Sequence, residues 1–298
     1  MAVLVYPLRY LSYAAGFWLL ISLSTLGMVV TVWLTGSELG LRKPWLVVLA
    51  GASLLTSSFR FLTFRNHIEV ILALLAALGW IRLRRRGNPG AYWGVAAALK
   101  LFPALWTVAQ IRNRKAIMAG ALSFIAVSGV TVWVVGTSDV TTFVRDVVPL
   151  SRQWYEATGN YSLMSLGSVV GGLGLGWALS GLGLVGFGWT IYRLGDHPDA
   201  LYVSGVAWSL LLSPLSWLNY LVVVISPLMV AVPNINWSVR RQLYPGVAML
   251  AGLLALRPVV TLNSYWLNVG LSRIPTLSLL LLAVWAPLLM VRRLGVET

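Results

Sequence analysis

Apolar runs of about 20 residues recur along this chain of 298 residues, separated by short basic or glycine-rich segments. A helix of about 20 apolar residues crosses the roughly 30 Å hydrocarbon layer of a bilayer. The pattern predicts an all-α, polytopic integral membrane bundle with about nine spans and one re-entrant helical hairpin, in a single domain, 1–298. The predicted spans cover residues 14–35, 44–61, 67–83, 116–136, 173–193, 198–213, 217–233, 243–257 and 274–291, and the hairpin covers 90–111.

The hairpin at 90–111 is predicted because this apolar run is basic at both ends, with arginines within 82–86 and 112–115. Basic residues mark the cytoplasmic ends of membrane segments, so the run enters and leaves on one side. It would break near 100–103, where Lys100 precedes Pro103 by three residues. A central lysine costs about 2.5–3.5 kcal/mol on insertion scales and usually marks function. The alternative is one tilted helix along which Lys100 snorkels to the surface.

The basic residues also predict the sidedness of the chain. Fourteen of the 22 fall in loops that the span count places on one side, which is then the cytoplasm, together with the C-terminus. The opposite side holds one long loop, about 137–172, and long inter-helix loops are often functional. We therefore expect a multi-pass protein of the cell membrane with an external working surface. The same count places residues 1–10 outside, which suggests that an N-terminal piece is missing.

Composition narrows the function. Hydrophobic residues make up 58% and charged residues 10% of the chain, against about 25% charged in soluble domains. The net charge of +14 lies in loop clusters rather than in a basic domain, so we expect no nucleic-acid partner. Cysteine is absent and the two histidines, His67 and His197, share no ligand spacing, so we expect no metal and no cofactor. Glycines in 159–188, such as Gly172 and Gly176, suit close helix packing.

Several segments, taken in order, resemble glycosyltransferase family 87, integral-membrane enzymes of the GT-C class. Residues 94–103, Gly-Val-Ala-Ala-Ala-Leu-Lys-Leu-Phe-Pro, resemble that family's small-residue run ending in Lys-x-x-Pro, and the basic loop 112–115 follows as in the family. Residues 160–163, Asn-Tyr-Ser-Leu, resemble its Asn-x-Ser-Leu element. Residues 212–217, Leu-Ser-Pro-Leu-Ser-Trp, resemble its Ser-Pro-x-Ser-Trp element, and Tyr6-Pro7 resembles a Tyr-Pro element after its first span.

The resemblance implies a hexosyltransferase. Its donor would be a polyprenyl-phosphate sugar, mannose-like, used in a cavity that opens at the outer membrane face. The partners would be that donor, a lipid or surface-glycan acceptor, and membrane lipids.

Three departures from the family pattern bear on activity. The first span and outer loop, where such enzymes keep a catalytic aspartate, have no counterpart here. A Gly-Gln-x-Asn/Glu element is reduced to Asn66-His67-Ile68-Glu69, which retains only its last position. Many relatives have histidine after Ser-Trp, where this chain has Leu218-Asn219-Tyr220.

Lys100 is the strongest candidate for binding the donor phosphate, at the tip of two half-helices. Arg60 and Arg65 would steady the leaving phosphate, because guanidinium groups match phosphate oxygens. Without the usual aspartate, Glu69 is the best candidate for the base that takes the proton of the acceptor hydroxyl. The alternative for Glu69 is an i, i+4 ion pair with Arg65.

Further candidates lie around the predicted outer mouth. Asn66 and His67 complete the cluster with the two arginines and Glu69. In the outer loop, Asp146 and Glu156 are rivals for the base, or members of a solvated charged loop. Trp154 and Tyr155 would stack on a sugar or anchor the loop at the interface.

Four polar or aromatic residues complete the predicted substrate site. Asn160 would bind sugar hydroxyls or cap the helix that starts near Tyr161. Trp217, Asn219 and Tyr220 would face the cavity, or would join neighbouring helices by polar contacts.

Two rival functions fit the same pattern. A transporter or lipid flippase would share broken helices and a buried cation, but no second Lys-x-x-Pro hairpin occurs to suggest an inverted repeat. A catalytically inactive remnant would bind lipid-linked sugar without transferring it.

Overall fold

The computed structural model describes residues 10–65, 67, 69–157, 159–195, 197–235 and 273–295, and every regular element among them is a helix. Four helical segments in this part of the chain are long and apolar enough to cross a membrane, or five if one bent pair is a single span. They are α2 (Tyr13–Glu38), α8 (Arg114–Val135), α11 (Leu163–Leu194) and the segment Ile274–Val291. The all-α membrane fold is therefore confirmed, whereas the predicted span 243–257 lies outside the described residues.

The range predicted as one span, 44–61, is divided. Helix α3 (Lys43–Leu55) ends before Thr56, and α4 (Ser57–Phe64) leaves at 61° to it. Thr56 is extended and its hydroxyl accepts a hydrogen bond from the backbone N–H of Phe59, which caps α4. A side chain that offers the backbone such a bond competes with helix continuation, which accounts for the break.

The hairpin between the two basic loops is broken where the sequence predicts. Helix α5 (Glu69–Arg84) leads into α6 (Gly90–Leu99), which ends at an extended Lys100 with φ −148° and ψ 140°. Pro103 then precedes the short α7 (Ala104–Val108), and α8 follows. The alternative of one continuous tilted helix is therefore wrong.

Small residues bring α6 close to α8. A Cβ at Gly94 would lie 2.1 Å from the carbonyl oxygen of Gly120, and one at Gly90 would lie 2.0 Å from that of Ala116. Only glycine allows backbones to approach this closely in a membrane bundle. The small-residue run before Lys100 is thus a packing surface that fixes where α6 ends.

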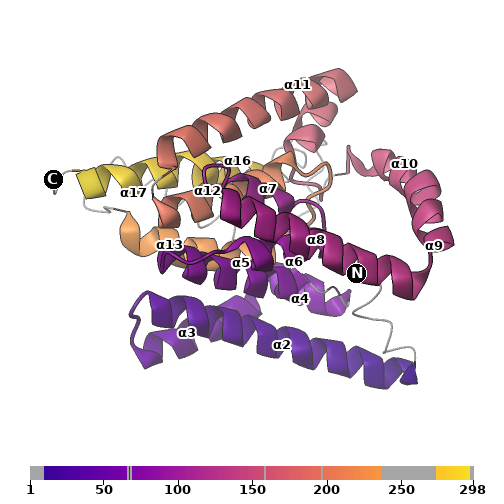
Figure 1. Ribbon diagram of the computed structural model, residues 1–298, viewed down its shortest axis with the longest axis horizontal. Coiled ribbons are helices and arrows are strands. Elements are labelled where there is room, and N and C mark those ends of the chain that lie inside the picture. Colours follow the sequence, from indigo (N-terminus) through magenta and orange to yellow (C-terminus); the bar gives the residue numbers. More distant parts are fainter. Residues whose placement is uncertain are drawn as a thin grey trace, which may run out of the picture.

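The segment predicted as a long outer loop, 137–172, is largely helical. Short elements follow α8: α9 (Thr137–Thr142), η2 (Phe143–Val147), α10 (Val148–Leu150) and η3 (Ser151–Trp154). In Figure 1 they lie at the end of the molecule opposite α17.

Helix α11 is kinked inside that predicted loop, at Gly171 and Gly172, the latter with φ 78°. A Cβ at Gly167 would lie 2.6 Å from the Cα of Gly176, so the two sides of the kink pack on each other. Of the two glycines predicted to suit close packing, Gly176 packs closely as predicted, whereas a Cβ at Gly172 would meet nothing within 4 Å and Gly172 instead provides the positive φ of the kink. The predicted span 173–193 begins directly after the kink.

Helix α12 (Pro198–Leu212) is the central element, because most of its side chains are buried and it contacts α5, α7, α11 and the C-terminal helices. The range predicted as the span 217–233 consists of the 3-10 segment η4 (Leu218–Val224) and α13 (Ile225–Asn234). The C-terminal segment comprises α16 (Ile274–Leu280), η5 (Leu281–Trp285) and α17 (Ala286–Gly295).

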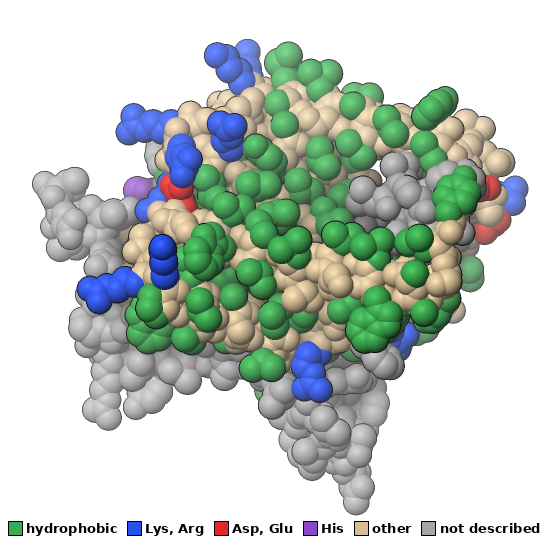
Figure 2. Space-filling view, turned by 90° about the horizontal axis from the view of Figure 1, so that it is seen from below, with side chains coloured by type: hydrophobic (Ala, Val, Ile, Leu, Met, Phe, Trp, Pro, Cys, Tyr) green, Lys and Arg blue, Asp and Glu red, His purple; other side chains and the backbone are tan. Residues whose placement is uncertain are grey.

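Contacts between α2 and α5 give the depth of Glu69. Glu38, at the end of α2, contacts Arg84 and Arg85, whereas Val70 packs against Gly27 in the middle of α2. Eleven helical residues separate Gly27 from Glu38, or about 16 Å along the axis. The N-terminus of α5 therefore lies near the middle of α2, not at its outer end. Figure 2 shows apolar side chains over the middle of one face, with most of its lysine and arginine side chains at one end.

Candidate functional site

The break after α6 places Lys100 against the first residue of α5. The Nζ of Lys100 forms an ion pair with Oε1 of Glu69. The Glu69 side chain is 0% exposed and that of Lys100 is 16% exposed. Two charges removed from water need such a partner, because an isolated buried charge is costly. Lys100 therefore points to a buried carboxylate rather than to the membrane surface.

An imidazole and an aromatic ring surround this pair. Nδ1 of His67 lies 3.5 Å from the same Oε1 of Glu69, and the His67 side chain is 39% exposed. The Lys100 ammonium lies 3.8 Å from the ring centroid of Tyr220, a cation–π distance. Tyr220 in turn stacks on Phe102, with ring centroids 5.4 Å apart. Lys100 and His67 thus contact the same carboxylate oxygen, and Tyr220 contacts Lys100 through the ring that Phe102 supports.

The second carboxylate oxygen of Glu69, Oε2, is buried and has no hydrogen-bond partner among the described residues. A carboxylate with two ionisable neighbours on one oxygen and none on the other is well suited to exchanging partners when a ligand binds. Within the described residues the Lys100 ammonium forms one ion pair, with a carboxylate oxygen whose place a phosphate oxygen could take.

The two arginines expected at the mouth do not join this pair. Arg60 and Arg65 are exposed, and the guanidinium of Arg65 lies over the ring of Phe61 at 5.5 Å. Glu69 pairs with Lys100 and His67, so the alternative pairing with Arg65 is wrong. Arg65 ends α4 and Glu69 begins α5, so helical spacing does not apply to them. Asn66 lies outside the described residues.

Asn160 joins the outer loop to the segment after α12. Its Oδ1 accepts hydrogen bonds from the backbone N–H groups of Ser216 (2.9 Å) and Ser162 (3.2 Å), and its Nδ2 donates to the carbonyl of Pro214 (2.9 Å). The side chain is completely buried. The hydroxyl that caps α11 belongs to Ser162. We therefore assign Asn160 a structural role, and direct sugar binding by it remains an untested prediction.

Arg273 strengthens this junction and was not singled out from the sequence. It is 4% exposed and donates through Nη1 to the carbonyl of Asn160 and, at 2.8 Å, to Oγ of Ser165. Thr276 adds a hydrogen bond to the carbonyl of Tyr161 at 3.0 Å. The available signal was an isolated arginine that opens an apolar span directly before Ile274-Pro275.

Trp217 and Asn219 lie between this junction and Lys100. The Trp217 ring meets that of Trp154 edge-on, with centroids 6.0 Å apart. Asn219 is 1% exposed, and within the described chain its Nδ2 has no hydrogen-bond partner. A buried amide without a partner is a candidate for contact with a ligand.

The outer-loop carboxylates stand apart from this cluster. Asp146 is exposed and pairs with Arg145 through two hydrogen bonds of 2.7 and 3.0 Å, which lower the pKa of Asp146 below its usual range. Glu156 is exposed. These features fit a solvated charged loop, and a lowered pKa makes Asp146 a weaker base.

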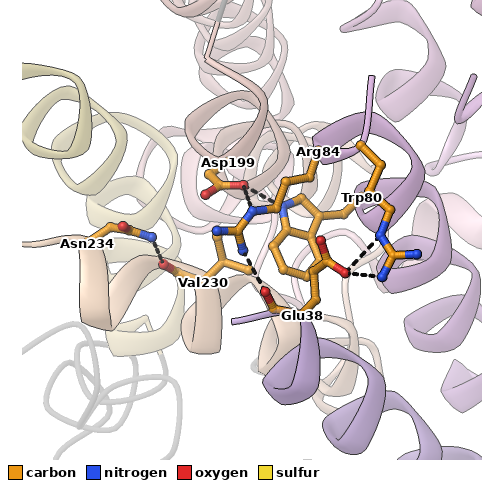
Figure 3. A network of polar contacts seen from close by, with 7 residues as sticks. Glu38, Trp80, Arg84, Asp199, Val230 and Asn234 are labelled. Atoms are coloured by element: carbon orange, nitrogen blue, oxygen red, sulfur yellow. Dashed lines mark hydrogen bonds and ion pairs between the residues drawn. The ribbon is translucent and has the colours of Figure 1, made fainter. Parts of the chain in front are cut away.

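A second polar network lies at the basic end of the bundle (Figure 3). The indole N–H of Trp80 donates to Oδ1 of Asp199 at 2.8 Å, and Arg84 donates to the carbonyl of Glu38 at 3.3 Å. Arg85 binds the Glu38 carboxylate, which raises the pKa of Arg85. These contacts join the end of α2, the basic end of α5 and the start of α12. Asp199 is thus part of a helix junction, which the sequence did not indicate.

No group of three potential metal ligands among His, Cys, Asp and Glu occurs within the described residues. The site chemistry that the structure shows is that of an ammonium, a carboxylate and an imidazole in contact.

Comparison with known proteins gives one match. The sequence profile of glycosyltransferase family 87 matches residues 1–214, which is 214 of the 298 residues. No curated protein and no solved structure shows significant similarity. The matched range includes Glu69 and Lys100, while Tyr220 lies beyond it. The chain therefore belongs to glycosyltransferase family 87 and is a membrane glycosyltransferase.

Proposed function

We propose that this protein transfers a mannose-like hexose from a polyprenyl-phosphate donor to a lipid or surface-glycan acceptor at the outer face of the cell membrane. The observation that carries the proposal is Lys100, an ammonium held at a helix break about midway along α2. A lipid-linked sugar presents its phosphate at a membrane, and a positive charge at this depth is suited to receive it. The C-terminus would be cytoplasmic, and residues 1–298 would form one domain.

In this mechanism the donor phosphate replaces the Glu69 carboxylate at Nζ of Lys100. The bond between the anomeric carbon and the phosphate oxygen breaks, and its electron pair stays on the phosphate. A new bond forms between the acceptor oxygen and the anomeric carbon, and the acceptor proton passes to a base. Arg60 and Arg65, both exposed on or next to α4, would add positive charge for the leaving phosphate.

Glu69 would supply the negative charge for this step, either as the base itself or through a neighbouring group that takes the proton. It is the acidic residue that contacts the proposed phosphate-binding lysine, and release of Lys100 would leave its negative charge uncompensated. A buried carboxylate that loses its cationic partner has a greater affinity for a proton. Donor binding would therefore increase the basicity of this carboxylate.

Two rival functions would use the same lysine but would differ in their products. A flippase would use the same buried lysine to carry a lipid phosphate and would make no new glycosidic bond. An inactive remnant would bind donor through Lys100 and transfer nothing.

The test uses membranes that contain the full chain, incubated with radiolabelled polyprenyl-phosphate hexose. We expect label in an acceptor fraction with the wild type, and loss of both donor binding and transfer with Lys100→Met. Lys115→Met, an exposed lysine at the basic end of α8, is the matched control and should behave as wild type. Donor binding without any labelled acceptor would favour the remnant, and unchanged binding and transfer in Lys100→Met would exclude the proposed site.

A further inference from the structure

We propose that His67 is the group that takes the proton of the acceptor hydroxyl, and that Glu69 is a positioning residue that acts through it. This inference rests on the proposed transferase function and names the acceptor-activating group within the same site.

Access is the first argument. The Glu69 side chain is 0% exposed, and its Oε2 is buried. Its Oε1 already contacts both Lys100 and His67. An acceptor hydroxyl must come within about 3 Å of the base that deprotonates it. The His67 side chain is 39% exposed and lies directly beside the carboxylate. The acceptor hydroxyl can therefore reach the imidazole, whereas it cannot reach the buried carboxylate.

Second, one nitrogen of the His67 imidazole faces the carboxylate, which leaves the other to accept a proton. Nδ1 of His67 is the nitrogen nearest the carboxylate, at 3.5 Å from Oε1. A carboxylate next to Nδ1 favours a proton on that nitrogen and leaves the lone pair on Nε2. Contacts of this kind are often long before substrate binds and shorten afterwards. The backbone N–H of His67 donates to the carbonyl of Leu62 at 3.0 Å, which holds the residue in place after α4.

The third argument is the position of Lys100. Its ammonium and the imidazole contact the same carboxylate oxygen, so the proposed phosphate site and the proposed base are neighbours. When a donor phosphate draws Lys100 away, the carboxylate charge is left to stabilise the imidazolium that forms. Charged groups near His67 in the described chain are Glu69, Lys100 through Glu69, and Arg65 two residues earlier.

The step balances as follows. The acceptor O–H bond breaks, and its proton goes to Nε2 of His67 while the acceptor oxygen bonds to the anomeric carbon. The polyprenyl phosphate leaves with the electron pair of the former C–O bond. The imidazolium then returns its proton to water at the exposed side.

The experiment compares His67→Ala with His197→Ala in the full chain, because these are the two histidines of the sequence. General-base catalysis contributes about 100- to 10,000-fold, so we expect His67→Ala to lower kcat by at least roughly 100-fold at unchanged donor binding. Added imidazole should restore part of the rate in His67→Ala and have no effect on wild type or His197→Ala. The wild-type rate should fall as the pH is lowered, because a protonated imidazole cannot accept the acceptor proton, and His67→Gln should lose that fall.

The outcomes separate this inference from the proposed function. If the wild type transfers sugar, Lys100→Met does not, and His67→Ala keeps the wild-type rate and pH profile, His67 is not the base although the transferase function stands. Loss of activity in His67→Ala without imidazole rescue, and with the pH profile unchanged in His67→Gln, also overturns the inference. If the wild type transfers nothing, the proposed function fails and this inference fails with it.

Discussion

Two charged residues that lie 31 positions apart, Glu69 and Lys100, meet in the interior of this protein and form the ion pair of the candidate site. Lys100 lies at a helix break and Glu69 at a helix start. Neither residue is therefore held in the middle of a continuous helix. Their pairing satisfies both charges when no substrate is bound. The same pairing means that any anion reaching Lys100 changes the environment of Glu69.

The ion pair predicts an asymmetric effect on stability. Removing one partner of a buried pair costs about 3–5 kcal/mol, while neutralising both is far less costly. We expect Lys100→Met to lower the melting temperature markedly in detergent, and the double variant with Glu69→Gln to recover most of the loss. Transfer activity should stay absent in both. Equal destabilisation of the single and double variants would contradict a direct pair.

The uncharged hydrogen bonds of Asn160 predict a second effect on stability. Replacing Asn160 by alanine leaves the backbone N–H groups of Ser162 and Ser216 without their bonds to Oδ1, at roughly 1–3 kcal/mol per buried orphaned group, while the carbonyl of Pro214 keeps its bond from the Ser162 hydroxyl. Asn234→Ala is the matched control, since that side chain makes one bond, to Val230, at the end of α13. Thermal unfolding should show a clear loss for Asn160→Ala and a small one for Asn234→Ala; similar losses would count against the junction.

At the scale of elements, the candidate site depends on the short helix α6, which ends within the bundle. Helix α6 has ten residues, too few to cross a bilayer, and its end is set by glycine contacts with α8. Its tip carries Lys100, and η4 places Tyr220 under the ammonium. The position of the ammonium therefore depends on how closely α6 and α8 approach.

Gly94 tests that dependence. A Cβ at Gly94 would lie 2.1 Å from the carbonyl oxygen of Gly120, so alanine there must push α6 away from α8, at about 1–3 kcal/mol for overpacking. Gly129→Ala, on the same α8 with nothing within 4 Å, is the control and should be neutral or slightly stabilising. We expect Gly94→Ala to lower both the melting temperature and donor binding. If Gly94→Ala is destabilised but binds donor as the wild type does, donor binding does not depend on how closely α6 and α8 approach.

At the scale of the whole molecule, polar contacts divide the bundle into two different ends. The network of Glu38, Arg84 and Asp199 closes the basic end, and the junction of Asn160 with Pro214 closes the other. The pair of Glu69 and Lys100 lies between these levels, beside the middle of α2. This arrangement sets the depth of the pair within the bundle. That substrates reach it from the outer face is part of the proposed function.

The proposed sidedness can be checked directly because the chain has no cysteine of its own. Ser138 and Lys115 are exposed at opposite ends of α8. In intact cells we expect a membrane-impermeant maleimide to label Ser138→Cys at once and Lys115→Cys only after permeabilisation. The reverse pattern would place the basic loops outside and refute the proposed orientation.

Several features could be predicted from local sequence because they depend on local physics. Runs of apolar residues predict membrane helices, and Lys100 with Pro103 inside such a run predicts a break. Other features depend on partners distant in the chain. The bend at Thr56 and the contact of Gly167 with Gly176 leave no pattern in neighbouring residues, and the isolated Arg273 before an apolar span does not reveal the partners that bury it.

The sequence by itself determined that this is an all-α membrane protein of glycosyltransferase family 87 with a lysine at a helix break, because hydrophobicity, charge clusters and proline act over short ranges. Only the tertiary structure decided that Lys100 pairs with Glu69, that the partly exposed His67 lies beside that carboxylate, and that Asn160 is buried and hydrogen-bonded to Pro214 and Ser216. These facts depend on which helices pack together and at what depth. Packing is settled by the fit of whole surfaces, such as glycines against backbone between α6 and α8, and no single segment contains that information.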